Sequence, residues 1–251
     1  MLLRNRNAVI YGGGGAIGSA VARAFARAGA RVHLAGRTRG SLDEAAESVR
    51  AAGGLADTDQ VDALDEAAVD RFTDAVVERA GSLDISFSLI SFGEVQGIPL
   101  TEISLADFER PVHNAVRAMF LTSRSAARHM IRQKSGVILA FGGYGDPPRE
   151  HRLGGFQVAF GAMESLRRNL AAELGPHGIR VLTLQTGGVP DTLPENADYR
   201  DAVTSEIDGH TLLGRAASLD DVGSVAVFAA SDMARSMTAT ALNITGGSVV
   251  D

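Results

Sequence analysis

Strand-like apolar segments alternate with helical patterns from one end of the chain to the other. The strand-like segments cover residues 8–11, 31–35, 56–61, 83–90, 136–141, 179–184 and 241–244. The periodicity of apolar residues between them predicts helices over residues 17–28, 42–52, 66–80, 104–133, 155–174 and 218–230. Because parallel strands need long crossover connections, this alternation favours a doubly wound α/β domain with helices on both faces of its sheet. We therefore expect a single domain over residues 1–251, with a mainly parallel sheet of about seven strands.

Two stretches interrupt this regular pattern. Pro111 lies inside the long helical pattern and is expected to break or restart that helix, because proline lacks the amide hydrogen that a helix needs. Residues 187–214 have no strong period and contain two prolines, which is typical of a loop with a function of its own. We interpret this segment as a mobile substrate lid.

Charge and composition exclude several classes of function. The formal net charge is -6, so the chain offers no basic field for nucleic acid or for an anionic membrane. It has no cysteine, which excludes disulfides, thiolate metal sites and a cysteine nucleophile and favours the cytoplasm as its location. No apolar run approaches the roughly 18 residues that a membrane span needs. The six histidines show no spacing typical of a metal site, so no metal is predicted.

A run of four glycines, Gly12 to Gly15, stops the first strand-like segment, and Gly18 lies in the first turn of the predicted helix that follows. A dinucleotide-binding turn needs this context, because its backbone must approach a pyrophosphate closely and direct free amide hydrogens at it from a helix N-terminus. The alternative is an ordinary turn between strand and helix. We interpret the run as the dinucleotide-binding loop of a Rossmann-type domain.

The side chains that follow the second and third strands indicate which nucleotide such a loop would bind. Arg37 follows the second strand, and no Asp or Glu occurs between Arg31 and Leu42. An acidic residue at this point hydrogen-bonds the ribose of NAD, whereas an arginine accommodates the 2′-phosphate of NADP. The sequence therefore favours NADP(H). Asp62 follows the third strand and could contact adenine. The alternatives are a solvated loop arginine at 37 and a helix-capping aspartate at 62.

Several motifs in the right order resemble the short-chain dehydrogenase/reductase superfamily. Gly12 to Gly18 resemble its TGxxxGxG loop, residues 62–65 its adenine-contacting DVxD, and Asn114 its mid-helix asparagine. Residues 170–174, 178–181, 213–215 and 238–247 are similar to its later signatures. The resemblance covers nearly the whole chain and implies an NADP(H)-dependent oxidoreductase with a small-molecule substrate, assembled as a homodimer or homotetramer. It also implies that the cofactor is bound by Gly12, Gly15, Ile17, Gly18, Arg37, Asp62, Ala63, Gly187 and Val189.

The resemblance implies a mechanism as well. In this superfamily a tyrosine hydroxyl donates or accepts the proton, and a lysine four residues later lowers its pKa and holds the nicotinamide ribose. A serine orients the substrate carbonyl, and the asparagine holds a water in a proton relay. An unperturbed phenol has a pKa near 10, so it needs a nearby cation to work near pH 7. In this chain the serine, tyrosine and lysine positions fall on Gly143, Phe156 and Phe160.

No shift of the alignment restores these residues. Lys134 is the one lysine of the chain and precedes the fifth strand. None of Tyr11, Tyr144 and Tyr199 is followed four residues later by a lysine or an arginine. A phenyl ring has no exchangeable proton, so the usual hydride transfer with Tyr–Lys proton delivery is not expected. Of the four catalytic positions only Asn114 keeps its residue, and a satisfied helix asparagine is the alternative interpretation of it.

Other side chains could replace the missing acid. Tyr144 follows the serine position at the carboxyl edge of the sheet, where such folds bind ligands, and His151 lies later in the same loop. The alternative is a solvated charged loop.

Three hypotheses remain. They are an NADP(H)-dependent oxidoreductase with a relocated acid such as Tyr144 or His151, a non-redox enzyme such as a cyclase, dehydratase or lyase, and a non-catalytic binding or regulatory subunit. Phe156 and Phe160 indicate a small apolar substrate or ligand.

Overall fold

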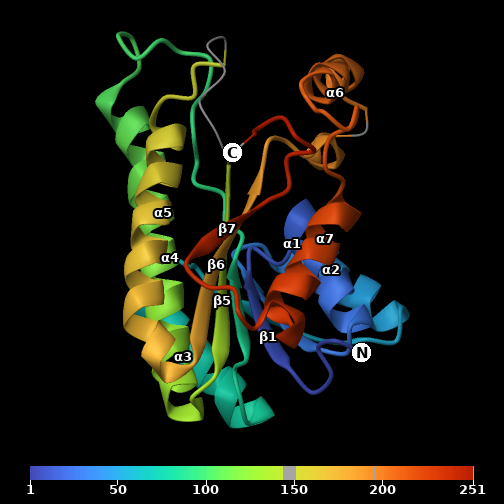
Figure 1. Cartoon of the computed structure of the whole chain (residues 1–251), viewed down its shortest axis with the longest axis vertical. Helices are drawn as coiled ribbons and strands as arrows, with labels where there is room; N and C mark the ends of the chain where they lie inside the picture. The colour runs from blue at the N-terminus through green and yellow to red at the C-terminus, as the bar shows by residue number, and fades with distance from the viewer. Residues whose placement is uncertain (144–150, 195, 251) are drawn as a thin grey trace.

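A parallel sheet forms the centre of the structure (Figure 1). The computed structural model describes residues 1–143, 151–194 and 196–250. In these residues seven strands form one sheet in the order β3-β2-β1-β4-β5-β6-β7, and every pairing is parallel. The strands are β1 (Asn7–Tyr11), β2 (Arg31–Gly36), β3 (Leu55–Gln60), β4 (Ile85–Ser88), β5 (Gly136–Gly143), β6 (Ile179–Thr186) and β7 (Thr240–Asn243). The strand order reverses between β1 and β4, so the predicted doubly wound α/β fold is confirmed.

Helices cover both faces of this sheet (Figure 1). One face carries α1 (Ala16–Arg27), α2 (Arg39–Ala51) and α7 (Leu219–Ala230), and the other carries α3 (Glu66–Ala80), α4 (Leu105–Gln133) and α5 (Gly155–Leu174). Helix α6 (Arg200–Gly209) stands apart beyond the carboxyl edge of the sheet, and the short 3-10 helices are η1 (Gly175–His177), η2 (Pro190–Thr192) and η3 (Asp232–Ala234). No helix in the described part of the chain is long and apolar enough to cross a membrane.

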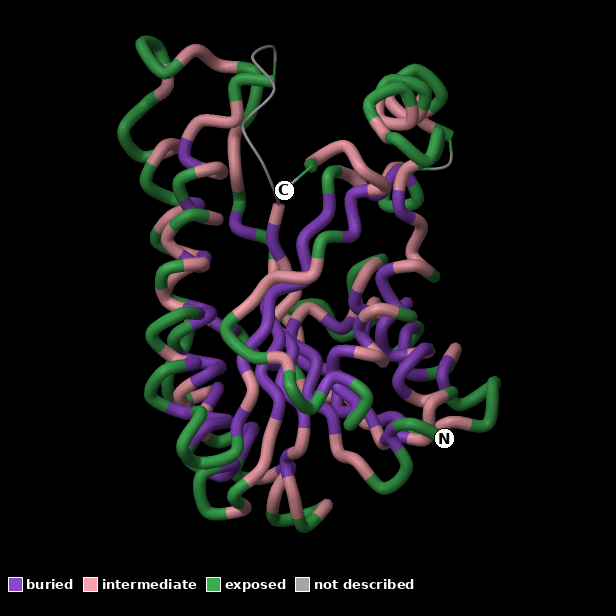
Figure 2. The backbone as a smooth tube through the Cα atoms, in the orientation of Figure 1, coloured by how far each residue is buried: buried purple, intermediate pink, exposed green. Residues whose placement is uncertain are grey.

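Both faces of the sheet are buried beneath the helices (Figure 2). Alternate residues of one strand enter different layers: Ile10 of β1 packs in the apolar cluster beneath α1, α2 and α7, and Val9 in the cluster beneath α3, α4 and α5. In β5, Leu139 and Ile138 divide in the same way. Continuous apolar strands such as these are expected wherever helices cover both faces of a parallel sheet.

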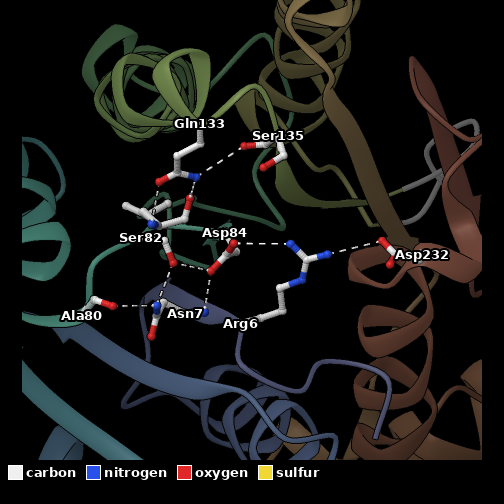
Figure 3. A network of polar contacts seen from close by, with 9 residues as sticks. Arg6, Asn7, Ala80, Ser82, Asp84, Gln133, Ser135 and Asp232 are labelled. Carbon is white, nitrogen blue, oxygen red and sulfur yellow. Dashed lines mark hydrogen bonds and ion pairs between the residues drawn. The ribbon is translucent and has the colours of Figure 1, made fainter.

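A polar network closes the amino edge of the sheet, at the start of β1 and β4 (Figure 3). The Asp84 carboxylate accepts hydrogen bonds from the Asn7 amide at 2.8 Å and from Arg6 Nη1 at 3.4 Å. The side chain of Gln133, at the end of α4, bonds both the amide and the carbonyl of Leu83, at 3.0 and 2.9 Å. These bonds hold the start of β1, the segment before β4 and the end of α4 together at the amino edge of the sheet. Ligands of doubly wound folds bind at the opposite, carboxyl edge.

The expected break at Pro111 was wrong, because α4 runs without interruption through that residue. Pro111 is buried where α4 meets the first residue of α5: a Cβ atom on Gly155 would lie 3.1 Å from Pro111 Cγ. The ring removes one helical hydrogen bond, and this contact between helices offsets the loss.

The sequence did not predict the helix α6 inside residues 187–214. None of the residues of α6 is buried, and its apolar side is narrow, with Val203 and Ile207 half-buried one turn apart, so the segment shows only a weak helical period. Ile207 is its point of contact with the end of β6, because a Cβ atom on Gly188 would lie 3.0 Å from Ile207 Cδ1.

His33 is a buried titratable group in β2. Its side chain is fully buried, and its Nδ1 lies 3.4 Å from Asp57 Oδ2 on β3. Burial lowers the pKa of His33 from 6.5 to about 4, and the charge of Asp57 opposes this shift only in part. The folded protein therefore keeps this imidazole neutral over the range in which the unfolded chain protonates it.

Acid should destabilise the fold through His33. The unfolded chain binds this proton near pH 6.5 and the folded chain only near pH 4, so stability is lost as the pH falls through this window. We expect the free energy of unfolding to fall by about 2 kcal/mol more between pH 7 and pH 5 in the wild type than in His33→Val. Urea titrations at both pH values measure the difference, and equal losses in the two proteins would contradict the assignment.

Candidate functional site

The turn between β1 and α1 contains glycines at which any side chain would collide with neighbouring backbone. Gly12 has a φ of +77°, and a Cβ atom there would collide with the Leu89 carbonyl after β4. A Cβ atom on Gly18 would collide with the Gly12 carbonyl. The first turn of α1 therefore sits directly on the end of β1, which leaves the backbone of the turn open toward a ligand.

A cavity of about 540 Å³ opens above this turn at the carboxyl edge of the sheet. Its described lining comes from the ends of β1 to β4 and from α2 and α4. Of the residues predicted to bind the cofactor, those that line it are Gly12, Gly15, Arg37, Asp62 and Ala63. Those outside the lining are Ile17, Gly18, Gly187 and Val189. The structure thus brings together the residues predicted at the ends of the first three strands.

Two helix N-termini face this cavity without a capping side chain. Gly15 and Thr38 are the N-cap residues of α1 and α2, and neither helix has a side-chain cap or an acidic residue in its first turn. Helices α3, α4 and α7, by contrast, are capped by Asp65, Ser104 and Ser218. The free amide groups and the dipoles of α1 and α2 favour an anion at the cavity edge.

Arg37 adds a free cation to the same end of the cavity. Its guanidinium has no hydrogen-bond or ion-pair partner among the described residues, while its carbonyl accepts from Gln60 Nε2 at 2.8 Å. The neighbouring Arg39 is engaged, because its Nε donates to Asp43 at 2.9 Å. The hydroxyl-bearing residues Thr38 and Ser41 line the cavity next to Arg37. This end of the cavity is therefore suited to a phosphate group.

Three phenylalanine rings, Phe92, Phe156 and Phe160, form an aromatic cluster between α5 and the segment after β4. The ring centroids of Phe156 and Phe160 are 4.4 Å apart, and each lies 6.0 Å from that of Phe92. A Cβ atom on Gly143 would lie 2.5 Å from Phe160 Cε2. The residues at the predicted tyrosine and lysine positions thus pack against each other, and one covers the predicted serine position.

A buried ion pair lies one to two turns further along α5. Arg167 is 4% exposed and donates from Nε and Nη2 to Glu164 Oε2 at 3.0 and 2.7 Å. The other oxygen of Glu164 accepts from Thr183 Oγ1 of β6 at 2.6 Å. Sequence analysis missed this pair, although a glutamate and an arginine three residues apart on a helix were a usable signal.

Two residues on one face of α4 line the far end of the cavity. Asn114 Nδ2 donates to the Phe92 carbonyl at 3.0 Å, and Arg110 Nη1, one turn earlier, donates to the Gly93 carbonyl at 3.3 Å. The candidate catalytic residue Asn114 is therefore at the cavity but is engaged with the backbone. Arg110 was not predicted; its spacing of four residues from Asn114 is the signal that could have found it.

The side chains considered as proton donors differ in where the structure places them. Tyr144 lies outside the described residues. His151 Nε2 lies 3.0 Å from Glu206 Oε1 on α6, so this histidine connects the segment before α5 to the predicted lid. Tyr11 borders the cavity, but burial and, to a lesser extent, the charge of Asp70 raise the pKa of its phenol far above the usual range, so it stays protonated. The described residues contain no cluster of side chains able to hold a metal ion.

A doubly wound sheet with a glycine turn and a cavity at its switch point is the architecture of dinucleotide-binding proteins. A family model described as Enoyl-(Acyl carrier protein) reductase matches residues 14–248. The chain belongs to the short-chain dehydrogenase/reductase superfamily of oxidoreductases.

Known relatives are similar over nearly their whole length. Gluconate 5-dehydrogenase of Gluconobacter oxydans (strain 621H) is 27% identical over 99% of this chain and 96% of its own. Momilactone A synthase of Oryza sativa subsp. japonica is 31% identical over 96% of this chain and 88% of its own. The solved structure of NAD+-bound xylitol dehydrogenase has a TM-score of 0.88 at 25% identity, covering 98% of this chain and all of that one. A nicotinamide cofactor is thus bound by a protein of the same fold.

Proposed function

We propose that this chain binds NADP(H) and acts as an oxidoreductase without the serine, tyrosine and lysine that its superfamily uses. The observation that carries the proposal is the cavity at the carboxyl edge of the sheet. There the Arg37 guanidinium, which has no partner in the part of the chain that the structure describes, and the uncapped N-termini of α1 and α2 offer donors to an anionic ligand. The glycine turn below them leaves room for a pyrophosphate, so the residues present fit the adenosine diphosphate part of the cofactor.

NADP(H) is preferred over NAD(H) in this proposal because of the charge at the end of β2. The residues that follow this strand are Arg37, Thr38 and Arg39, and no carboxylate is available there to accept the 2′-hydroxyl of NAD. An arginine with free donors, flanked by hydroxyl-bearing side chains, instead matches a 2′-phosphate.

The chemistry divides between the cofactor and the chain. Bound reduced nicotinamide supplies a hydride, and a carbonyl that accepts it also needs a proton. Phe156 and Phe160 cannot supply this proton, so we assign its delivery to a group outside α5. Tyr144 remains the first candidate and His151 the second, with Asn114 as a residue that orients the adjacent backbone.

The aromatic cluster of Phe92, Phe156 and Phe160 supports a small apolar substrate.

We also expect a homodimer or homotetramer, because Phe120 and Val158 expose apolar side chains on α4 and α5. The lack of cysteine supports a cytoplasmic location. Residues 187–214, with α6, remain our candidate for the substrate lid.

A non-redox reaction is the second candidate function, and the packing of Phe160 on Gly143 favours it. This packing leaves an apolar surface where a carbonyl would need polar donors. A cyclase, dehydratase or lyase, or a binding or regulatory subunit, would tolerate such a surface. Failure of the wild type to bind NADPH at millimolar concentration would favour these alternatives over the oxidoreductase.

Substitution of Arg37 tests the proposed cofactor. We expect Arg37→Ser to weaken NADPH binding about 10- to 100-fold, since it removes charge-assisted hydrogen bonds worth about 1.5–3 kcal/mol, and to change NADH binding less than about twofold. Arg39→Ser is the matched control, because Arg39 is paired with Asp43 and does not line the cavity. Calorimetric titration of the three proteins with both nucleotides measures these effects, and equal loss of both nucleotides in Arg37→Ser would refute the 2′-phosphate assignment.

A further inference from the structure

The residue at the superfamily's lysine position carries no charge in this chain. Another residue would therefore have to supply a positive charge to the nicotinamide nucleotide of the cofactor. At that position stands Phe160, whose ring packs against Phe156 and the Gly143 backbone. The next cation on the same helix, Arg167, is buried and paired with Glu164. No described residue of α5 lines the cavity. A cation for this end of the cavity must therefore come from another element.

The described lining of the cavity contains two cations, Arg37 and Arg110. Arg37 follows β2, on the side of the switch point that carries the glycine turn. Arg110 belongs to α4 and lies beside the segment that follows β4, on the other side of the switch point. A dinucleotide in a doubly wound sheet lies across this point, with one nucleotide on each side. The two cations therefore stand at opposite ends of the space that a dinucleotide would fill.

Contacts on one edge of its guanidinium hold Arg110 in place. Nη1 donates to the Gly93 carbonyl at 3.3 Å and Nη2 to Asp107 Oδ1 at 2.5 Å. The Ser104 hydroxyl and then the Arg110 guanidinium hold the pKa of Asp107 below its usual range, so this carboxylate stays charged. Gly93 has a φ of +72°, and a Cβ atom there would lie 3.3 Å from Arg110 Cδ, so the stem of Arg110 lies over a residue without a side chain.

These contacts do not use all of the N–H donors of the Arg110 guanidinium. A guanidinium has five N–H donors, and the described residues engage two of them. The remaining donors belong to a side chain that is 45% exposed and that Asp107 and Gly93 orient, so less side-chain entropy is lost when they bind. Such a fork can bond the hydroxyl and phosphate oxygens of a nucleotide.

We propose that Arg110 binds the nicotinamide nucleotide of the cofactor, at its ribose and phosphate oxygens, and supplies the positive charge that Phe160 does not. This inference rests on the proposed binding of NADP(H). Asn114, one turn later on the same face, holds the neighbouring Phe92 carbonyl and keeps the segment after β4 in place beside Arg110.

Two ligands distinguish the ends of the cavity. NADPH spans both ends, whereas adenosine 2′,5′-bisphosphate reaches only the end at Arg37. We expect Arg110→Met to weaken NADPH binding about tenfold or more and to leave the binding of adenosine 2′,5′-bisphosphate within about twofold of the wild type. Arg110→Lys should recover part of the loss, since it keeps the charge without the fork. Arg37→Ser should weaken both ligands.

Arg128→Met is the matched control, because Arg128 lies on α4, pairs with Asp70 and does not line the cavity. It should bind both ligands like the wild type, and thermal unfolding should show every variant folded. Equal weakening of both ligands in Arg110→Met would assign Arg110 a structural role and overturn the inference, as would unchanged binding of NADPH. Failure of the wild type to bind either ligand would instead overturn the proposed function itself.

Discussion

Glu164→Leu is expected to lower the free energy of unfolding by about 3–5 kcal/mol, because it leaves a buried arginine without a counter-charge. The Arg167 guanidinium is almost fully buried, and Glu164 accepts two of its hydrogen bonds. Nη1 of Arg167 already lacks a hydrogen-bond partner among the described residues. Removing the Glu164 carboxylate would leave Nε and Nη2 of Arg167 without their acceptor, and the Thr183 hydroxyl would lose its acceptor as well. Urea denaturation at neutral pH measures the loss.

The double variant Glu164→Leu/Arg167→Met is the control for this prediction. Buried ion pairs gain little over well-packed apolar residues of similar volume, since desolvation cancels most of the attraction. The double variant should therefore recover most of the stability that the single one loses. A single variant that loses less than about 1 kcal/mol would show that water reaches Arg167 and that the pair is not buried in solution.

Gly143→Ala is expected to cost about 1–3 kcal/mol, because the new methyl group would enter the space of the Phe160 ring. The nearest ring atom, Cε2, would lie 2.5 Å from it. Gly142→Ala should change stability by less than about 0.5 kcal/mol, since a Cβ atom at Gly142 meets its nearest neighbours, on Phe160 and Thr183, at 3.5 Å. Chemical denaturation of both variants measures the contrast.

A double-mutant cycle with Phe160→Ala tests whether the ring causes this cost. In the Phe160→Ala background Gly143→Ala should be nearly neutral, which gives a coupling energy of about 1–3 kcal/mol between the two sites. Additive effects would place the cost of Gly143→Ala in the backbone of β5 rather than in the ring. The same cycle shows whether a serine can be introduced at residue 143 while Phe160 is present.

The fold was predictable from the sequence because its signals are local. The helices over residues 66–80 and 155–174 were predicted to the residue. Gly81 ends the first in the left-handed conformation, whereas Gly175 after the second is right-handed and leads into the short 3-10 helix η1. Strand β4 proved shorter than residues 83–90, because Leu83 is tied to Gln133 and the chain leaves the sheet after Ser88. The continuation of α4 through Pro111 was missed because a contact between helices decides it, and α6 was missed because its apolar side is narrow and none of its residues is buried.

The residues of the candidate site that directly follow a strand were predictable from the sequence. Gly12, Gly15, Arg37 and Asp62 follow strands whose ends meet at one edge, so pattern alone brings them to the cavity. The spacing of four residues places Arg110 on the same face of α4 as Asn114, but its contact with Gly93 depends on the path of the segment after β4, which the sequence pattern does not encode. The contact of Phe160 with Gly143 joins residues on two elements, and residue types alone do not reveal it.

The Phe160 ring over Gly143 also limits which side chains residue 143 can carry. A serine at residue 143 clashes while Phe160 remains, a lysine at residue 160 has no phenol to activate, and a tyrosine at residue 156 has no cation beside it. A single substitution at one of these three positions would therefore clash or stand without its chemical partner, so the three side chains would have to be introduced together.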